Sequence, residues 1–164
     1  SSIWINPVAK GVPEITKSET MQQIRDLVKE DPQAIWLVAD MAYPATNIPA
    51  MAGADCLNTT QTYPQKTRWE MLDPEGEYED IYNRYCHIRA SLGSKTMLEL
   101  VSTDYVEVTL SPEDLKKLNI RYIVSTNDFD EKIAAGTTNI FTDSGIEFQK
   151  YYEGTQLSIY GCVY

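Results

Sequence analysis

The sequence has little of several residue types on which common functions depend. It contains one histidine and three cysteines, and its 14 lysines and arginines are outnumbered by 24 aspartates and glutamates, which gives a net charge of −10. The excess of acids argues against nucleic acid or anionic lipid as a partner, because both require basic patches that displace counterions. No apolar run approaches the roughly 18 residues of a membrane-spanning helix, and no signal peptide is visible.

Motifs that would identify an enzyme are also missing. The sequence holds no GxSxG nucleophile elbow, no phosphate-binding glycine loop and no HExxH zinc motif. Cys56, Cys86 and Cys162 lack CxxC or Cys/His metal spacing. An odd, small number of cysteines fits free, partly buried thiols better than a disulfide framework, with one bridge left open. We therefore assign no catalytic residue and expect no metal and no cofactor.

What the sequence does contain is typical of a globular domain. Of its 164 residues, 43% are hydrophobic and 23% are charged, and there are 11 tyrosines, three tryptophans and three phenylalanines. The length is sufficient for one hydrophobic core. The chain begins SSIWINP, without a methionine, and ends on the apolar SIYGCVY. We predict a single soluble domain, residues 1–164, excised from a longer protein.

The first part of the chain predicts a helix that feeds a buried strand. Thr16-Lys-Ser-Glu19 has the pattern of a capping box at a helix start, and Asp31-Pro32 ends the helical run. The next segment, AIWLVA at 34–39, is a continuous apolar run of the kind that a fully buried strand has. This succession indicates an α/β layer architecture.

Residues 41–65 fit neither a helical nor a strand period. The segment contains three prolines and a single charged residue, Asp55, and it has too little charge for a disordered segment. We therefore predict an ordered loop. Because it leaves the carboxyl end of a buried strand, where α/β proteins place ligand crevices, the loop is a candidate binding segment. A loop that only covers the sheet edge is the alternative.

The acidic segment DPEGEYED begins at Asp73. We interpret it as the start of a helix, because acidic side chains are stabilising at the amino end of a helix. A calcium loop is the alternative, but Gly76 does not occupy the sixth position that an EF-hand requires.

The segment from Glu77 to Leu92 predicts one helix. Apolar side chains recur at helical spacing and would form its buried stripe: Ile81, Tyr85, Ile88 and Leu92. On this helix Cys86 and His87 lie off the stripe, which argues against a catalytic Cys/His pair.

The remainder of the chain predicts mainly strands. One hairpin joins Met97–Val101 to Tyr105–Leu110, and a second, in the carboxyl-terminal tail, turns at Glu153-Gly154. Between them, Ser111-Pro-Glu-Asp114 predicts the start of a short helix, followed by a strand at 120–125 and a loop with a short helical turn at 127–136. The predicted fold class is α/β (α+β mixed): a single layered domain with a mixed β-sheet packed by two or three helices and a C-terminal β-hairpin.

Four segments carry a resemblance to a known family: LSPEDLKKLNIRYIVST, FQKYYEGTQLSIY, AMAGADCLNTTQTYP and EDIYNRYCHI. Together they resemble the C-terminal extracytoplasmic domain of bacterial multi-pass membrane proteins of the polyprenyl-sugar-dependent glycosyltransferase type, most strongly from Asp80 onward. The resemblance implies a parent protein with membrane helices before Ser1 and a location on the extracytoplasmic face of the bacterial cell membrane. In that family, catalysis is assigned to membrane-proximal loops that this chain lacks, so no catalytic residue is transferred to it.

Three functions follow as alternatives. The first is a non-catalytic accessory domain that contacts a glycan or polyprenyl-linked sugar beside the membrane part of its parent; the second is a structural or protein-interaction domain. The third is a stand-alone hydrolase that uses Asp40, with His87 as acid or base. Sugar sites combine aromatic platforms with planar polar groups. The candidate ligand-binding residues of that kind are Asp40, Tyr43, Asn47, Asn58, Tyr63, Trp69 and Arg84.

Overall fold

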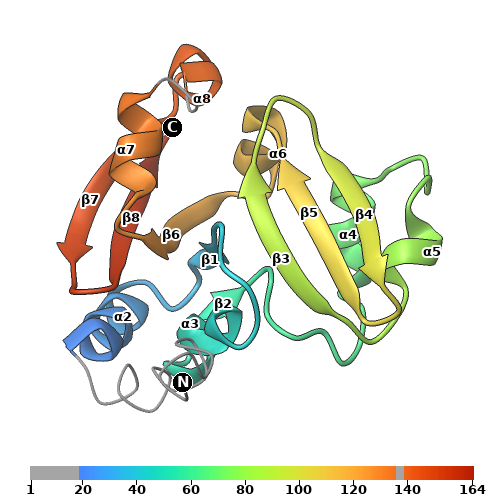
Figure 1. Cartoon of the computed structure of the whole chain (residues 1–164), viewed down its shortest axis with the longest axis horizontal. Coiled ribbons are helices and arrows are strands. Elements are labelled where there is room, and N and C mark those ends of the chain that lie inside the picture. Colours follow the sequence, from blue (N-terminus) through green and yellow to red (C-terminus); the bar gives the residue numbers. More distant parts are fainter. Residues whose placement is uncertain (1–18, 136–138) are drawn as a thin grey trace, which may run out of the picture.

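The computed structural model describes residues 19–135 and 139–164 and arranges this part of the chain as two β-sheets with helices around them (Figure 1). The strand order is β2-β1-β6-β8-β7 in one sheet and β3-β5-β4 in the other. The strands are β1 (Ile35–Val38), β2 (Asp55–Cys56), β3 (His87–Leu92), β4 (Met97–Ser102), β5 (Tyr105–Leu110), β6 (Ile120–Thr126), β7 (Glu147–Glu153) and β8 (Leu157–Val163). The helices are α2 (Glu19–Glu30), η2 (Ala45–Asn47, a 3-10 helix), α3 (Ile48–Met51), α4 (Lys66–Leu72), α5 (Glu79–Tyr82), α6 (Pro112–Lys117), α7 (Phe129–Ala134) and α8 (Asn139–Asp143). The predicted α/β mixed class is confirmed, with the strands divided between two sheets.

The five-stranded sheet is organised around β1. Trp36, Leu37 and Val38 are fully buried, as expected for an apolar strand that is covered on both faces. β1 pairs in parallel with β2 and β6, whereas β8 pairs antiparallel with β6 and β7, so the sheet is mixed. Helix α2 ends at Glu30, before Asp31-Pro32, as predicted. The start of its predicted capping box lies outside the described residues.

Most local predictions for the second half of the chain are confirmed. β4 and β5 form one hairpin and β7 and β8 the other. The Ser111 hydroxyl accepts a hydrogen bond from the Asp114 amide at the start of α6, and Pro112 is its first residue. Asn119 follows the helix at a φ of 53°, a left-handed conformation that asparagine tolerates better than most residues.

The predicted helix from Glu77 to Leu92 is wrong. Only its first part is helical, as α5, and the rest is β3. The same residues also alternate with a period of two, since Cys86, Ile88 and Ala90 are buried while the residues between them are partly exposed. All six residues of β3 pair in parallel with β5. These long-range hydrogen bonds outweigh the local helical pattern, because a strand is stabilised by a partner that the local sequence does not contain.

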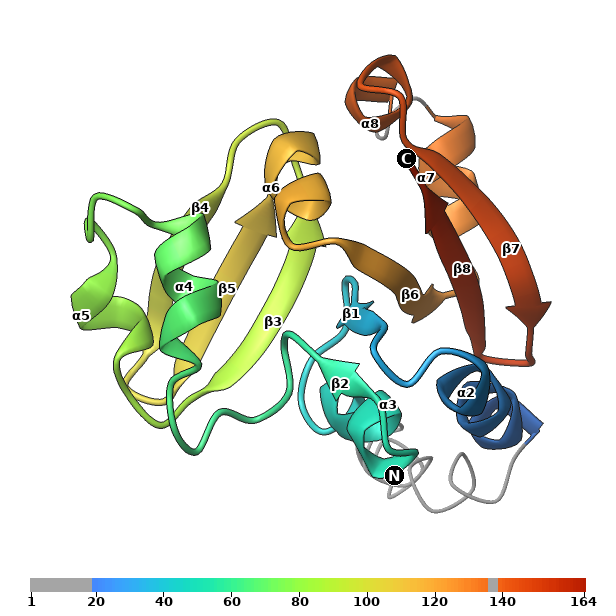
Figure 2. The same ribbon diagram turned by 180° about the vertical axis from the view of Figure 1, so that it is seen from behind.

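The three-stranded sheet has one covered face and one open face. Figures 1 and 2 show α4 against one face, whereas no described helix lies on the other. Ile88 and Val106 face the covered side and are buried, and the alternating residues of β3 and β5 are only partly buried. The open face therefore presents side chains of β3 and β5 to solvent.

The two sheets meet where β1 approaches β3. Ala39 and Ala90 form an isolated parallel bridge between them. Asn58, which is 0% exposed, inserts its side-chain amide beside this bridge. Its Oδ1 accepts from the Val38 amide at 2.8 Å, and its Nδ2 donates to the Val38 carbonyl at 2.7 Å and toward the Ile88 carbonyl at 3.5 Å. Asn58 thus takes the place of a strand residue beside β1.

Hydrophobic packing continues across this junction. One core cluster contains side chains from both sheets, among them Leu37, Ile88, Val106 and Ile123. A second cluster lies between α2, α3 and the opposite face of the five-stranded sheet and includes Trp36. The loop at 41–65 is ordered, as predicted, and contains η2, α3 and β2.

All three cysteines are free and buried. Burial raises the pKa of Cys56 to about 12, of Cys86 to about 11 and of Cys162 to about 12, because a thiolate is poorly solvated in the interior. The preference for free thiols is confirmed, and none of the three has the environment of a reactive thiol.

We predict that the folded protein resists thiol-reactive reagents at mildly alkaline pH and that all three cysteines react after unfolding. The raised pKa values also mean that the folded state keeps protons that the unfolded state releases. The buried, protonated thiols therefore make their full contribution to the free energy of unfolding below about pH 9, and this contribution declines as the pH rises toward 12. Thiol titration with and without denaturant provides the measurement; rapid labelling of any cysteine in the folded protein would contradict the prediction.

We predict that Asn58→Ala lowers the free energy of unfolding by about 2–4 kcal/mol, because both backbone groups of Val38 would lose a buried partner. Urea unfolding of the variant tests this. Asn83 is exposed, so Asn83→Ala is the matched control and should change stability by no more than about 0.5 kcal/mol. Equal effects of the two substitutions would show that the junction does not depend on Asn58.

Candidate functional site

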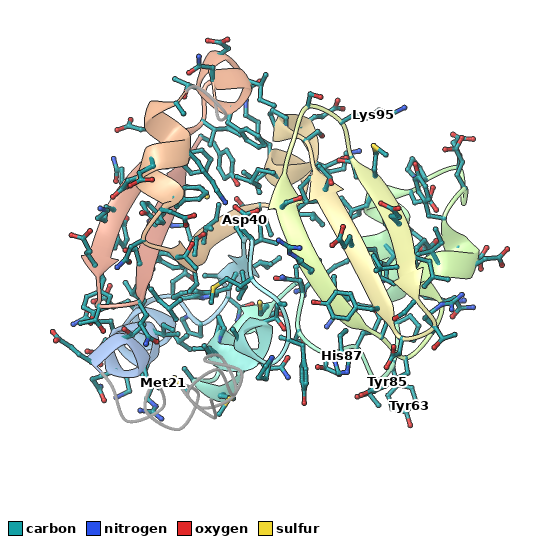
Figure 3. The ribbon with its side chains drawn as sticks, in the orientation of Figure 1. Met21, Asp40, Tyr63, Tyr85, His87 and Lys95 are labelled. Carbon is teal, nitrogen blue, oxygen red and sulfur yellow. The ribbon has the colours of Figure 1, made fainter. Side chains whose placement is uncertain are left out.

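Four aromatic side chains gather at the amino end of β3. The His87 ring centroid lies 4.1 Å from that of Tyr43, 5.6 Å from that of Tyr85 and 6.4 Å from that of Tyr105. Tyr43 is 48% exposed and Tyr85 is 52% exposed, while His87 and Tyr105 are partly buried. We refer to Tyr43, Tyr85, His87 and Tyr105 as the aromatic patch. Figure 3 labels His87 and Tyr85, which lie at the lower edge of the three-stranded sheet in that view.

Three separate segments supply the aromatic patch. His87 and Tyr105 are directly paired in the register of β3 and β5 and lie on the open face of the sheet. Tyr85 precedes β3 by two residues, and Tyr43 comes from the loop after β1. Pairing of strands that are distant in sequence therefore assembles the patch.

Polar residues bind the His87 ring at its nitrogen Nδ1. The Thr60 Oγ1 lies 2.9 Å from His87 Nδ1. Asn47 in turn binds Thr60 twice: its Oδ1 accepts from the Thr60 amide at 2.8 Å, and its Nδ2 donates to Thr60 Oγ1 at 3.1 Å. The Asn47–Thr60–His87 chain connects the predicted binding loop to β3.

The position of His87 differs from the predicted one. It belongs to a strand and lies at the centre of the aromatic patch. Cys86 is fully buried on the opposite face and receives a long contact from Gln61 Nε2 at 3.6 Å. Since successive strand residues point to opposite faces, His87 and Cys86 do not form a pair, in agreement with the sequence argument for a different reason.

Of the seven candidate residues, Tyr43 and Asn47 meet at the patch. Tyr63 is 84% exposed, and Figure 3 places its label at the same lower edge as Tyr85 and His87. Asp40 lies farther along β3, beside Ala90. The Asp40 amide donates to the Ala90 carbonyl, and Asp40 Oδ2 pairs with Lys132 Nζ at 2.8 Å. The structure therefore separates Asp40 from the aromatic patch.

Three other candidate residues, Asn58, Trp69 and Arg84, are engaged in packing or in hydrogen bonds within the protein. The hydrogen-bonding groups of Asn58 are occupied by backbone groups of β1 and β3. Trp69 is buried, stacks on Tyr82 with 5.3 Å between centroids, and donates from Nε1 to Gln61 Oε1 at 2.6 Å. Arg84 donates to three backbone carbonyls, those of Ile81, Thr103 and Asp80.

Tyr85, Tyr105 and Thr60 are not among the site residues named from the sequence, and His87 is considered there only as an acid or base in the hydrolase alternative. Tyr85 was assigned to the buried stripe of a helix, and His87 to its outer face. The alternation of apolar and polar residues in CHIRASL, residues 86–92, is the signal in the sequence, and it places His87 on the polar face of a strand. No local signal places Thr60 or Tyr43 beside His87.

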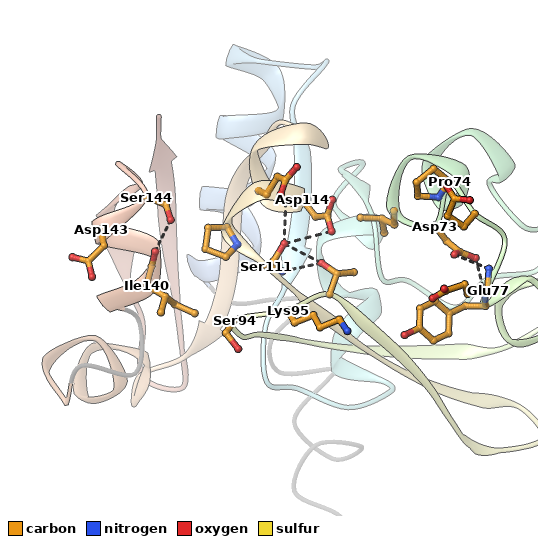
Figure 4. A pocket seen from close by; sticks show the side chains of 16 residues that line it. Asp73, Pro74, Glu77, Ser94, Lys95, Ser111, Asp114, Ile140, Asp143 and Ser144 are labelled. Atoms are coloured by element: carbon orange, nitrogen blue, oxygen red, sulfur yellow. Dashed lines mark hydrogen bonds between the residues drawn. The ribbon is translucent and has the colours of Figure 1, made fainter.

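A cavity of about 650 Å³ lies elsewhere, at the carboxyl ends of β3 and β5 (Figure 4). Carboxylates line much of it. Two of them are engaged in local structure, since Asp73 accepts from the amides of Glu77 and Tyr78 and Asp114 receives the Ser111 hydroxyl. Asp73 therefore organises the backbone before α5. The described residues contain no cluster of side chains suited to hold a metal ion.

A smaller cavity of about 190 Å³ adjoins the segment that carries Thr60. Threonine and glutamine side chains line it together with Tyr63, Trp69 and Arg68. Arg68 is paired in bidentate fashion with Asp55, so its charge is already compensated.

These features define a mixed α/β domain with an aromatic patch on its surface. The chain matches the family model of a domain of unknown function, DUF7654, over residues 14–164, and it belongs to that family. Comparisons with curated proteins and with solved structures gave no match. None of the helices in the described ranges combines the length and apolarity needed to cross a membrane.

Proposed function

We propose that the chain is a non-catalytic carbohydrate-binding domain that contacts a glycan through the aromatic patch. The observation that supports this most directly is the meeting of three tyrosines and the single histidine at the surface, with Tyr43 and Tyr85 about half exposed. Large aromatic rings are usually covered when they serve only packing. Here several rings from different segments remain accessible together.

The chemistry of the patch suits a sugar. The apolar C–H face of a pyranose packs on an aromatic ring, while its hydroxyls need hydrogen-bonding groups at the ring edges. Tyrosine hydroxyls and the His87 imidazole provide such groups at the rings themselves. The whole chain has a net charge of −10, which disfavours an anionic glycan by electrostatic repulsion. A neutral glycan is therefore the ligand class that we propose.

A binding role is favoured over hydrolysis. Acid–base catalysis needs two suitable groups within reach of one substrate bond. Asp40 is engaged with Lys132 and lies apart from the patch that contains His87. The three buried thiols are not available as nucleophiles.

We further propose that the domain is an accessory part of a bacterial membrane protein of the polyprenyl-sugar-dependent glycosyltransferase type, on the extracytoplasmic face of the cell membrane. The support is the resemblance of the segments from Asp80 onward and in the loop before α4. A glycan-contacting domain beside a membrane enzyme would present the acceptor sugar or a polyprenyl-linked sugar to it. The coding sequence that precedes Ser1 tests this part: we expect several apolar segments of about 20 residues, each long enough to span a membrane.

We predict that Tyr43→Ala and Tyr85→Ala each weaken glycan binding about two- to tenfold, because each removes a stacking surface worth roughly 0.5–1.5 kcal/mol. The purified wild-type domain is first screened against an array of neutral oligosaccharides, and the strongest ligand is then titrated by calorimetry into each variant.

Tyr151→Ala is the control for this experiment. Tyr151 is 41% exposed but lies on β7, in the other sheet and far from the three-stranded sheet in Figure 1. Its loss should leave glycan affinity unchanged. The absence of any glycan ligand, or an equal loss with all three variants, would contradict a carbohydrate site at the aromatic patch.

A further inference from the structure

We propose that His87 selects and orients the ligand of the aromatic patch as a neutral hydrogen-bond donor through Nε2–H, and that the Asn47–Thr60 pair fixes this tautomer. The inference rests on the proposed function for the identity of the ligand. The state of the ring itself is a property of the free protein and can be measured independently. It follows from the direction of three hydrogen bonds.

The first of the three hydrogen bonds, between Thr60 and Asn47, has only one possible direction. The Thr60 backbone N–H can only donate, and the atom that it meets at 2.8 Å is the side-chain oxygen of Asn47. This contact establishes which end of the Asn47 amide is oxygen and which is nitrogen. The other end, Nδ2, is therefore a donor, and it lies 3.1 Å from Thr60 Oγ1.

The direction of the second bond determines the third. Since Thr60 Oγ1 accepts from Asn47, the single hydroxyl proton of Thr60 is available for donation. Its neighbour at 2.9 Å is His87 Nδ1, and no other acceptor for this hydroxyl is present among the described residues. Donation to Nδ1 requires that nitrogen to be unprotonated. A proton on Nδ1 would leave the Thr60 hydroxyl proton without a protein partner among the described residues.

The neutral ring then carries its proton on Nε2. Within the described part of the chain, Nε2 has no hydrogen-bond partner, and it is not among the unpaired atoms that are shielded from solvent. The ring is flanked by Tyr43, Tyr85 and Tyr105. The donor Nε2–H is therefore available to a ligand at the aromatic patch.

A donor at this place has a consequence for ligand choice. A sugar that stacks on Tyr43 would be oriented by an acceptor oxygen, from a hydroxyl or an acetamido carbonyl, that meets Nε2–H. Thr60 and Asn47 act as positioning residues, because Thr60 binds the ring and Asn47 binds Thr60, and neither binds the ligand. The single histidine of the sequence makes the ring signals unambiguous in a magnetic resonance experiment.

The decisive variant is Asn47→Asp. The aspartate keeps the size of the side chain and still accepts from the Thr60 amide, but it cannot donate to Thr60 Oγ1. The Thr60 hydroxyl then donates to the new carboxylate, and its oxygen accepts from the ring, so Nδ1 becomes protonated. Asn83→Asp adds the same charge at an exposed site and is the control. Thr60→Ser retains the hydroxyl and should behave as wild type.

Nitrogen-15 spectra of the imidazole at mildly alkaline pH, where histidine side chains are ordinarily neutral, provide the first readout. We expect unprotonated Nδ1 in the wild type, in Asn83→Asp and in Thr60→Ser, and protonated Nδ1 in Asn47→Asp. Protonated Nδ1 in the wild type overturns the inference even if the Asn47 variant fails to fold. An unchanged tautomer in a folded Asn47→Asp variant overturns it as well.

The second readout is glycan affinity. His87→Phe keeps an aromatic ring in the patch but removes Nε2–H, and we expect about a five- to tenfold loss of affinity, the usual effect of one hydrogen bond. Wild-type affinity in this variant overturns the ligand-selecting role of His87 while the carbohydrate site itself stands, provided that Tyr43→Ala still weakens binding. If the wild type binds no glycan, both the proposed function and the ligand-selecting role fail.

Discussion

The arrangement of this protein depends on the amide of Asn58, which replaces a strand beside β1. Strand β2 has only two residues, so Val38 would otherwise face the junction of the two sheets with an unpaired amide and carbonyl. A buried backbone group without a partner costs about 1–3 kcal/mol. One planar side chain satisfies both groups and reaches toward Ile88 on β3. The two sheets can therefore share one hydrophobic core without continuous strand pairing between them.

The segment that follows Asn58 extends this junction to the surface. Thr60 binds Asn47 and His87, and the backbone of Gln61 pairs with Cys86 in both directions. The Gln61 side chain also donates to the carbonyls of Tyr82 and Arg84. Residues 58–61 thus position β3 relative to the loop that carries Tyr43. His87, which contacts the other three rings of the aromatic patch, is attached to this polar segment through Thr60, which is the kind of support that a preorganised binding site needs.

Sequence and structure agree where a local rule decides the conformation. The apolar run at 34–39, the Ser111 cap and the two hairpins follow from solvent exclusion, amide satisfaction and turn chemistry within a few residues. They disagree between Glu77 and Leu92, where one set of residues satisfies two periods. Ile88 lies on the buried side in both interpretations, but His87 lies on the polar face of the helix and beside three tyrosines in the strand. The pairing with β5 decides between them, and β5 lies outside the window in which a period is recognised.

The sequence by itself therefore determined the α/β class, the buried strand β1, the ordered loop after it and the preference for free thiols over a disulfide framework. Each of these depends on composition or on neighbours close in the chain. Only the tertiary structure decided that Asn58 is a structural link rather than a ligand-binding residue and that Trp69 and Arg84 serve packing and backbone support. It also decided that Tyr43, Tyr85, His87 and Tyr105 share one surface. The physical reason is that hydrogen bonds and ring contacts between β1, β3, β5 and the connecting loops join residues that are distant in sequence, and no local pattern encodes which of these segments will meet.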